Sequence, residues 1–313
     1  MDTSTPTTSA PITIVIPVHN RASLVGETLA SVEAQTFRPL RLIVVDNAST
    51  DGTLSLLTRW KEEHRTADFT VDILSEPRPG AAAARNRGLA EVTSPYTMFF
   101  DSDDIMAPGH VARAMEGFAS PSSPDVVGWD CHEINLDGTS RVIPFVTRSP
   151  LRHTIFHGTM STQRYAARTS LFRQAGGWNP DIYSWNDIEL AVRLLRLSPS
   201  IIRLKGEPTV TIRRTAVSIT GTSYSSGAGR REASLDSIEA NLATERERRL
   251  VRLRRAHLAG LYAAEGRPDL SAPLLARALA AEPSPLHRLL LRATCALTGR
   301  HIRGALRLFS PFF

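Results

Sequence analysis

The sequence predicts an α/β fold in which a mostly parallel sheet carries helices on both faces and an α-helical C-terminal extension follows. Short β-branched runs such as Ile12–Pro17 and Arg41–Asp46 alternate with stretches of helical periodicity over the first hundred residues. These runs are apolar almost throughout, as expected of strands that are buried on both faces. Beyond about residue 226 only helical patterns remain.

The order of the elements supports a parallel sheet, because repeated β-α-β units of this length place helices across both sheet faces. The predicted strands are 12–17, 41–46, 69–74 and 96–100, and the predicted helices between them are 24–35, 53–64 and 81–91. After residue 105 the alternation is lost. There we expect strands at 126–130, 141–146 and 209–214, helices at 166–175 and 187–197, and a hairpin turn at Asn135–Gly138. The predicted organisation is a disordered leader over 1–10, an α/β domain over 11–225 and a helical region over 226–313.

Composition limits the classes of partner and compartment. The net charge of the chain is +6 and is unevenly distributed. Residues 221–313 alone carry a net charge of +7, from 15 Arg against 8 acidic residues, so the rest of the chain is close to neutral. No basic groove interleaved with aromatic residues is visible, so we expect no nucleic acid partner, and anionic membrane lipid suits the basic tail better. The two cysteines are far apart, no apolar run approaches 18 residues, and residues 1–10 do not resemble a signal peptide. We expect a cytoplasmic protein, with the inner face of the membrane as a further location.

Polar side chains follow three of the predicted strands at the point where each strand ends. They are His19 and Asn20, Asp46 and Asn47, and the acidic run Asp101 to Asp104. Ligands of such sheets bind beyond the carboxyl ends of the strands, so these groups are expected to meet at one edge. Carboxylates at the end of an apolar strand are costly unless positive charge neutralises them, and a divalent metal would do so. The alternative is a solvated strand-to-turn corner.

Five motifs occur in an order that resembles family 2 inverting glycosyltransferases of the GT-A fold, in the nucleotide-diphospho-sugar transferase superfamily. The resemblance covers roughly residues 11–220. The motifs are Pro17-Val-His-Asn20, Asp46-Asn-Ala-Ser-Thr-Asp-Gly-Thr53, Gly80-Ala-Ala-Ala-Ala-Arg-Asn-Arg-Gly88, Asp101-Ser-Asp103 and Trp185-Asn-Asp-Ile-Glu-Leu190.

The resemblance implies a donor site for a nucleotide sugar. Asp46 would accept a hydrogen bond from the base, in the first instance uracil N3–H, and His19 would stack on the base or else serve as a loop histidine. The small residues before Arg85 would let a diphosphate approach a helix N-terminus, with Arg85 contacting phosphate or base; the alternative is an alanine-rich helix with a solvated arginine. The full expected donor set is Pro17, His19, Asn20, Asp46, Asn47, Arg85, Asp101 and Ser102.

The resemblance also implies a metal and a catalytic base. Asp103 would bind Mn²⁺ or Mg²⁺ directly, and Asp101 would hold the ribose or a metal-bound water. Asp187 would be the base that deprotonates the acceptor hydroxyl; the alternative is a plain acid at a helix N-terminus. The chain departs from the family pattern twice, with Asn186 in place of a glutamate and Thr215 where a metal-binding histidine often stands.

The expected acceptor side is less well marked. Aromatic faces suit the C–H faces of sugars, which makes Trp178, Tyr183 and Trp185 candidates, although ordinary core packing is the alternative for Trp178. Gly158 and Thr159 are further candidates for this side.

The resulting hypothesis is an inverting, metal-dependent hexosyltransferase that uses a nucleotide-sugar donor, in the first instance a UDP-sugar. The acceptor would be a saccharide or lipid-linked saccharide, as in cell-surface polysaccharide synthesis. Two alternatives are a sugar nucleotidyltransferase and a non-catalytic nucleotide- or glycan-binding module. In the tail, Ile302, Leu306 and Phe309 share one predicted helical side, with Arg303 and Arg307 beside them, which suggests peripheral membrane contact.

Overall fold

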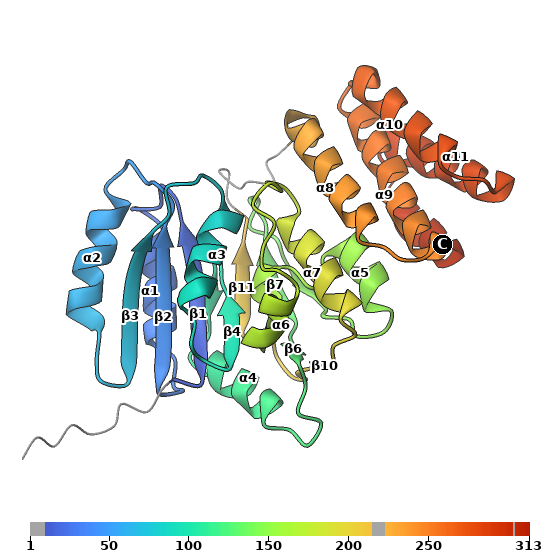
Figure 1. Cartoon of the computed structure of the whole chain (residues 1–313). Coiled ribbons are helices and arrows are strands. Elements are labelled where there is room, and N and C mark those ends of the chain that lie inside the picture. The colour runs from blue at the N-terminus through green and yellow to red at the C-terminus, as the bar shows by residue number, and fades with distance from the viewer. Residues whose placement is uncertain (1–9, 215–222, 303) are drawn as a thin grey trace, which may run out of the picture. The chain divides into compact units, whose positions relative to one another are not determined.

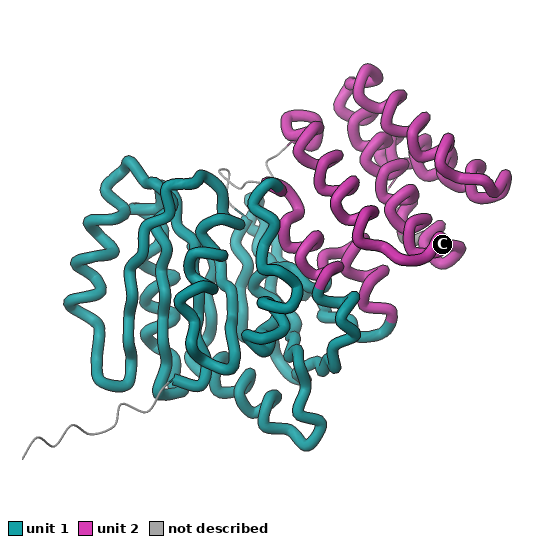
Figure 2. Tube along the Cα trace, in the orientation of Figure 1, with its two compact units in different colours: residues 1–148, 159–181, 194–215 teal, residues 149–158, 182–193, 216–313 magenta. Residues whose placement is uncertain are grey.

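The computed structural model describes residues 10–214, 223–302 and 304–313. The chain divides into two compact units (Figure 2). Unit 1 comprises residues 1–148, 159–181 and 194–215, and unit 2 comprises 149–158, 182–193 and 216–313. Residues 1–9 of the expected leader lie outside the described residues. So does Thr215, expected where a metal-binding histidine often stands. The domain boundaries expected from the sequence stay a prediction.

Unit 1 is built on a mixed seven-stranded sheet in the order β10-β6-β9-β4-β1-β2-β3 (Figure 1). The strands β1, β2, β3 and β4 are mutually parallel, as are β6 and β10, whereas β9 runs antiparallel between β4 and β6. The bounds are β1 Ile12–Val18, β2 Leu40–Asp46, β3 Phe69–Ser75, β4 Tyr96–Phe99, β6 Val126–Gly128, β9 Tyr165–Arg168 and β10 Ile201–Arg203.

A second, four-stranded sheet has the order β5-β11-β7-β8. Its strands are β5 Ile105–Met106, β7 Cys131–Ile134, β8 Ser140–Ile143 and β11 Val210–Arg213. The hairpin turn predicted at Asn135–Gly138 joins β7 to β8. The expected pairing of 126–130 with 141–146 is wrong, because β6 belongs to the large sheet and the half-polar strand β7 takes its place in the hairpin.

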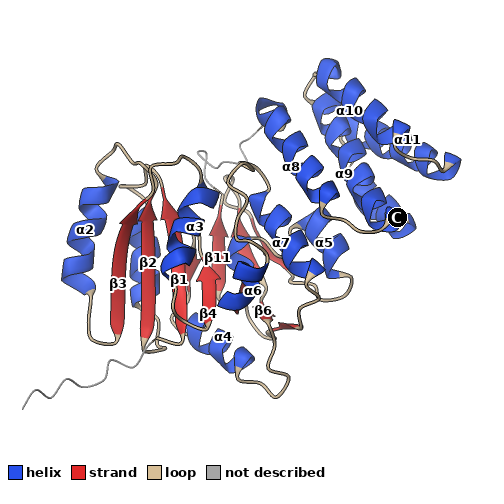
Figure 3. Ribbon diagram, viewed as in Figure 1, coloured by secondary structure: helices blue, strands red, loops and turns tan. Residues whose placement is uncertain are grey.

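Helices cover both faces of the large sheet, with α3 in front and α1 behind in Figure 3. The helices of unit 1 are α1 Val25–Glu33, α2 Thr53–His64, α3 Ala81–Glu91, α4 His110–Phe118 and α6 Thr169–Gln174, with a 3₁₀ turn at Thr162–Arg164. The helix expected at 166–175 is shorter, since its first residues form β9. Helix α3 lies close against the sheet at Gly88, where an added Cβ would lie 2.4 Å from Val15 Cγ1.

Unit 2 is helical and has its own core, which includes Ile188, Val192, Leu253 and Tyr262. Its elements are α5 Pro150–His157, the first part of α7 (Asn186–Arg196), α8 Ala228–Ala240, α9 Glu245–Ala264, α10 Pro268–Ala280, α11 Pro285–Gly299 and α12 Ala305–Phe309, with 3₁₀ turns at Ser225–Gly227 and Ser310–Phe312. None of the described helices combines the length and the apolar character that crossing a bilayer requires.

The structure changes one expectation about the tail and shows how two of its arginines are neutralised. The apolar side of the last helix faces inward, because Leu306 is buried and Phe309 packs against the core of unit 2. Two arginines of α9 are buried in ion pairs: Arg252 binds Glu245 and Glu282, and Arg255 binds Asp236 and Glu239. Ile302, the third apolar member of the predicted stripe, lies before α12 and is 49% exposed. Arg303 and the Arg307 side chain lie outside the described structure.

Candidate active site

The three polar clusters come from neighbouring strands. Strand β1 pairs with β2 on one side and β4 on the other, all in the same direction, with Val18 opposite Asp46 and Val15 opposite Phe99. The carboxyl ends of these strands therefore meet at one edge of the sheet. All of the site residues expected on β1, β2 and β4 lie in unit 1, so their geometry can be described together.

Asp46 ends β2 with a carboxylate that is only partly satisfied. The residue is 3% exposed, and its Oδ2 accepts a hydrogen bond from the Ser49 backbone N–H at 3.2 Å. Its Oδ1 is buried and has no hydrogen-bond partner among the described residues. A buried carboxylate oxygen without a donor is costly. The arrangement suits a ligand that brings an N–H group to this oxygen.

The loops around Asp46 are fixed by His19 and Asn47. His19 Nδ1–H donates to the Asn47 carbonyl oxygen at 2.7 Å, which ties the end of β1 to the end of β2. The Asn47 amide donates to the carbonyls of Glu76 and Arg78 and accepts from the Gly80 N–H at 2.7 Å. Asn20 Oδ1 similarly accepts from the Thr50 N–H. These polar groups shape the loops, while the Asp46 oxygen is left for a ligand.

Arg85 projects from α3 toward the end of β4. Its guanidinium donates to Asp101 Oδ1 at 2.6 Å and lies 4.3 Å from the centre of the Trp178 ring. The residue is 5% exposed, and its Nε and Nη1 have no hydrogen-bond partners within the described structure. A buried guanidinium with spare N–H groups is a natural phosphate or carbonyl ligand. The alternative of a solvated arginine is wrong, because this side chain is buried.

Trp178 is a core residue. It is 1% exposed, its ring packs edge-on against Phe99, and its backbone exchanges two hydrogen bonds of 2.8 Å with the Asn86 side chain. This burial favours the core-packing alternative over a sugar platform for Trp178. The Asn86 side chain, which sequence reasoning assigned no role, anchors this turn to α3.

The acidic run after β4 concentrates negative charge. Burial, followed by the charge of Asp101, raises the pKa of Asp103 above its ordinary value. Burial and the charges of Asp101 and Asp103 raise the pKa of Asp104 further. The Asp104 carboxylate accepts a hydrogen bond from the Arg213 backbone N–H at 2.8 Å. This contact gives Asp104 a structural role in joining the acidic run to β11. Ser102, between the first two acids, is nearly buried.

These carboxylates fit a divalent cation only with help from a substrate. Mutual repulsion between close carboxylates is relieved by a cation with hard oxygen ligands. Within the described ranges, however, no three His, Cys, Asp or Glu side chains converge as a complete metal site. Oxygens of a bound diphosphate would have to complete the ligand set.

Two arginines, Arg21 and Arg213, act on Asp103. The sequence offered Arg213 or Arg214 as a group that would help neutralise the leaving group, but it gave Arg21 no role. The Arg213 Nε donates to the Asp103 carbonyl oxygen, and its Nη1 pairs with Glu27. The charges of Arg21 and Arg213 both act to lower the pKa of Asp103. Arg214, by contrast, is committed to Glu133 at 2.7 Å. Because side chains alternate along a strand, the sequence could have placed Arg213 and Arg214 on opposite sides of it. The sequence could not have shown which carboxylates they bind.

The expected base and the remaining aromatic candidates belong to unit 2. Asp187 lies in the first turn of α7, as expected from its acidic start. Trp185, just before this helix, has a left-handed backbone with φ 51°, and the Arg254 guanidinium lies 4.7 Å from its ring centre. Tyr183 is exposed and is covered in part by Arg230 at 5.5 Å.

Helices α8 and α9 hold the start of α7 in place. Ser234 Oγ donates to the Ser184 carbonyl oxygen, and Ser237 Oγ donates to Glu189 at 3.1 Å. Arg254 also donates to the Phe156 carbonyl oxygen of α5. The helical extension therefore packs directly on the segment that carries Asp187. No sequence motif pointed to these contacts.

The last two acceptor candidates fall on either side of the division between the units. Gly158 ends α5 in unit 2 with a left-handed backbone, φ 59°, and Thr159 is buried in unit 1. Pro17 is buried within β1, opposite Val45.

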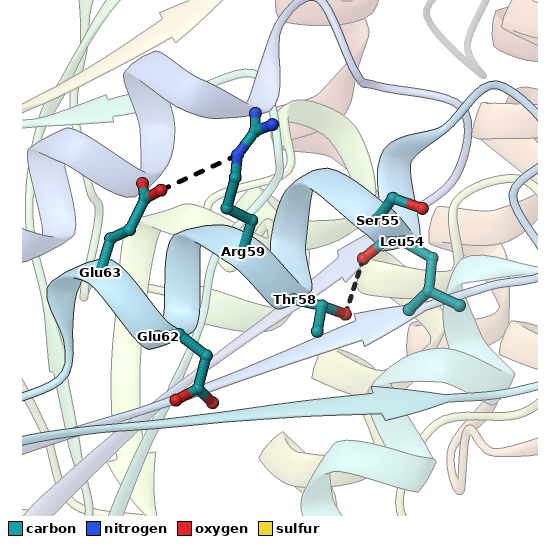
Figure 4. A pocket seen from close by; sticks show the side chains of 6 residues that line it. All are labelled: Leu54, Ser55, Thr58, Arg59, Glu62 and Glu63. Atoms are coloured by element: carbon teal, nitrogen blue, oxygen red, sulfur yellow. Dashed lines mark hydrogen bonds and ion pairs between the residues drawn. The ribbon is translucent and has the colours of Figure 1, made fainter.

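A hollow on α2 has no part in this site. Leu54, Ser55, Thr58, Arg59, Glu62 and Glu63 line it (Figure 4). All six belong to one helix, and none is an expected site residue.

Comparison with known proteins settles the family. The model of glycosyl transferase family 2 matches residues 13–175, more than half of the chain. The chain belongs to glycosyl transferase family 2. The match includes the strand ends of β1, β2 and β4, Arg85 and the acidic run.

Characterised relatives are distant. The chain is 28% identical over 212 residues to the pre-mycofactocin glycosyltransferase of Mycobacterium tuberculosis, covering 63% of this chain and 41% of that protein. It is 32% identical over 132 residues to the succinoglycan biosynthesis protein ExoW of Rhizobium meliloti, covering 41% of this chain and 39% of that protein. The chain thus spans about two fifths of the length of these relatives.

Solved structures share the fold. Residues 1–349 of S. aureus TarS in complex with UDP-GlcNAc superpose with a TM-score of 0.68 at 18% identity, covering 96% of this chain and 92% of that one. The mannosyltransferase PcManGT of Pyrobaculum calidifontis, in complex with GDP-Man and Mn²⁺, gives a TM-score of 0.58 at 24% identity, covering 98% and 87%. The expected GT-A fold with a helical C-terminal region is confirmed.

Proposed function

We propose that this chain is an inverting glycosyltransferase that moves a sugar from a nucleotide-diphosphate donor to a saccharide or lipid-linked saccharide. The observation that carries the proposal is the set of unmet groups at the edge of unit 1: the Asp46 oxygen without a donor, the spare N–H groups of Arg85 and the crowded carboxylates of Asp101 and Asp103. A nucleoside diphosphate with a divalent cation complements all of them. Family membership and the nucleotide-sugar complexes of the structural relatives support this reading.

The residues have distinct roles in the proposed donor site. Asp46 accepts the ring N–H of the base, which favours uracil over cytosine because cytosine N3 carries no hydrogen. Arg85 donates to the diphosphate or base while holding Asp101. Asp103, with Asp101 and the diphosphate oxygens, would hold Mn²⁺ or Mg²⁺, which supplies neutralisation of the charge on the departing nucleoside diphosphate.

Transfer is proposed as a single displacement. The acceptor hydroxyl oxygen attacks the anomeric carbon from the side opposite the diphosphate, and its proton passes to the Asp187 carboxylate. The new C–O bond forms as the bond to the phosphate oxygen breaks, and the electron pair leaves with the nucleoside diphosphate. The configuration at the anomeric carbon is thereby inverted.

Donor recognition is tested with Asp46→Asn. Loss of a hydrogen bond to a charged group costs about 1.5–3 kcal/mol, so UDP affinity is expected to fall about 10- to 150-fold. Calorimetric titration with UDP and with CDP, each with and without Mn²⁺, measures the change. The matched control is Asp68→Asn, an exposed carboxylate that precedes β3 at the opposite edge of the sheet. Equal affinity of the wild type for UDP and CDP would remove Asp46 from base recognition.

The base is tested with Asp187→Asn. This change should leave UDP binding intact and slow transfer by about 10²- to 10⁴-fold, the usual contribution of a general base. Single-turnover transfer from a UDP-sugar measures the step. Unchanged turnover would exclude Asp187 as the base. Binding of UDP without transfer or hydrolysis in the wild type would instead favour the non-catalytic binding module.

A further inference from the structure

An exposed apolar face lies at the C-terminal end of unit 2. Five of the twelve large hydrophobic side chains that are exposed in the described structure fall between residues 286 and 312. They include Leu286 and Leu289 on α11, with 59% and 63% exposed, and Phe312 with 61% exposed. Solvent-facing apolar residues that gather in this way mark a surface that meets something else.

Helix α11 is amphipathic in a way that leaves this face outward. Leu291, Thr294, Cys295 and Thr298 are buried on one side of the helix. At 100° per residue, the exposed positions fall on the opposite half of its circumference, except Arg288 in the first turn, which is exposed at the border of the buried side. We call them the α11 face: Leu286, Arg288, Leu289, Arg292, Ala296 and Arg300.

The end of the chain extends the α11 face. His287 Nε2–H donates to the Phe312 carbonyl oxygen at 3.0 Å, and the His287 ring packs against Phe313. The final 3₁₀ turn therefore lies beside the first turn of α11, and the exposed Phe312 side chain adds to its apolar residues.

The charge of this surface is one-sided. Residues 283–313 contain five arginines and neither Asp nor Glu. The arginines of the α11 face, Arg288, Arg292 and Arg300, make no ion pair with any described residue. Three arginines of α9 differ, because Arg249, Arg252 and Arg255 are neutralised inside the unit. Free positive charge and exposed leucines thus occur together on α11.

We propose that the α11 face docks on an anionic lipid bilayer, with the leucines and Phe312 entering the interface and the arginines meeting lipid phosphates. A bilayer surface complements both the apolar and the basic groups. A second copy of the chain would bring two sets of arginines together without acidic partners. Nucleic acid would meet the charge but would find leucines where stacking aromatic rings are needed. Docking of this kind does not depend on whether the chain transfers sugar.

The experiment is flotation of the full chain with vesicles. One set contains equal parts phosphatidylcholine and phosphatidylglycerol, and the other contains phosphatidylcholine alone. The variants are R288Q/R292Q and L286Q/L289Q, both at exposed positions that leave the core intact. The matched control is L54Q/R59Q on α2, which changes the same residue types at exposed positions beside Glu62 and Glu63.

The wild type should float with the phosphatidylglycerol vesicles, less so at high salt, and not with neutral ones. At about one kcal/mol per basic residue, R288Q/R292Q should weaken partitioning about 30-fold. L286Q/L289Q should weaken it by a similar factor, and L54Q/R59Q should behave as the wild type. Binding to neutral vesicles alone, no binding at all, or an equal loss in the control would overturn the proposal. So would a dimer in sedimentation velocity that L286Q/L289Q abolishes while the wild type does not float.

Discussion

Substitution of Gly88 tests how tightly α3 must pack to present Arg85. In Gly88→Ala the new Cβ would lie 2.4 Å from Val15 Cγ1 and 3.3 Å from Val45 Cγ2, although carbon atoms prefer about 3.5–4.0 Å. Val15 and Val45 are fully buried in the central strands β1 and β2, so neither can move freely. Either α3 shifts away from the sheet or the strands distort.

The magnitude follows from two opposing terms. Overpacking of a core costs about 1–3 kcal/mol, and replacing glycine by alanine within a helix regains up to about 1 kcal/mol. We expect Gly88→Ala to lower the free energy of unfolding by about 1–2 kcal/mol. Gly26→Ala in α1 is the matched control, because no atom lies within 4 Å of its added Cβ. That variant should be as stable as the wild type or slightly more stable.

Urea unfolding followed by circular dichroism compares the two variants through their midpoints at equal slope. Because Gly88 lies one turn after Arg85, a shifted α3 should also weaken UDP binding, measured by calorimetry. If Gly88→Ala proved as stable as Gly26→Ala and bound UDP as the wild type does, the close approach of α3 to the sheet would not position the donor site.

Two further predictions concern groups away from the donor site. Burial and the nearby Arg113 charge lower the pKa of His110 to about 3. The folded state therefore favours the neutral imidazole. The contribution of His110 to the free energy of unfolding is complete above the unfolded pKa near 6.5 and is lost as the pH falls toward 3. The wild type should therefore lose about 2 kcal/mol more free energy of unfolding between pH 7 and pH 5 than His110→Asn, measured by urea titration; parallel losses would exclude this histidine. Arg254→Gln removes the cation over the Trp185 ring and should lower kcat about fivefold with the donor KM unchanged, since such contacts contribute about 1 kcal/mol. A rise in donor KM alone would refute this positioning role.

The sequence alone determined the fold class and the edge of the sheet at which the polar residues meet. Strands β1 and β2 are read from continuous apolar runs, and α3 from its residues Ala81–Glu91, because periodicity and turn chemistry are local signals. The polar residues that follow the strands could be assigned to one edge from the order of the elements, since parallel strands share one carboxyl edge. Asp46 and Asp101 were identified in this way, whereas Arg85, within α3, was named from the family resemblance of its motif.

Only the tertiary structure decided how distant segments pack. Strand β9 inserts between β4 and β6 through pairings that no local pattern specifies. Trp178 is buried beneath Arg85, and the helix that carries Asp187 is braced by Ser234 and Arg254, from segments about fifty or more residues away. These placements depend on which surfaces bury each other. That choice depends on the shape and chemistry of whole elements rather than on any short stretch of sequence.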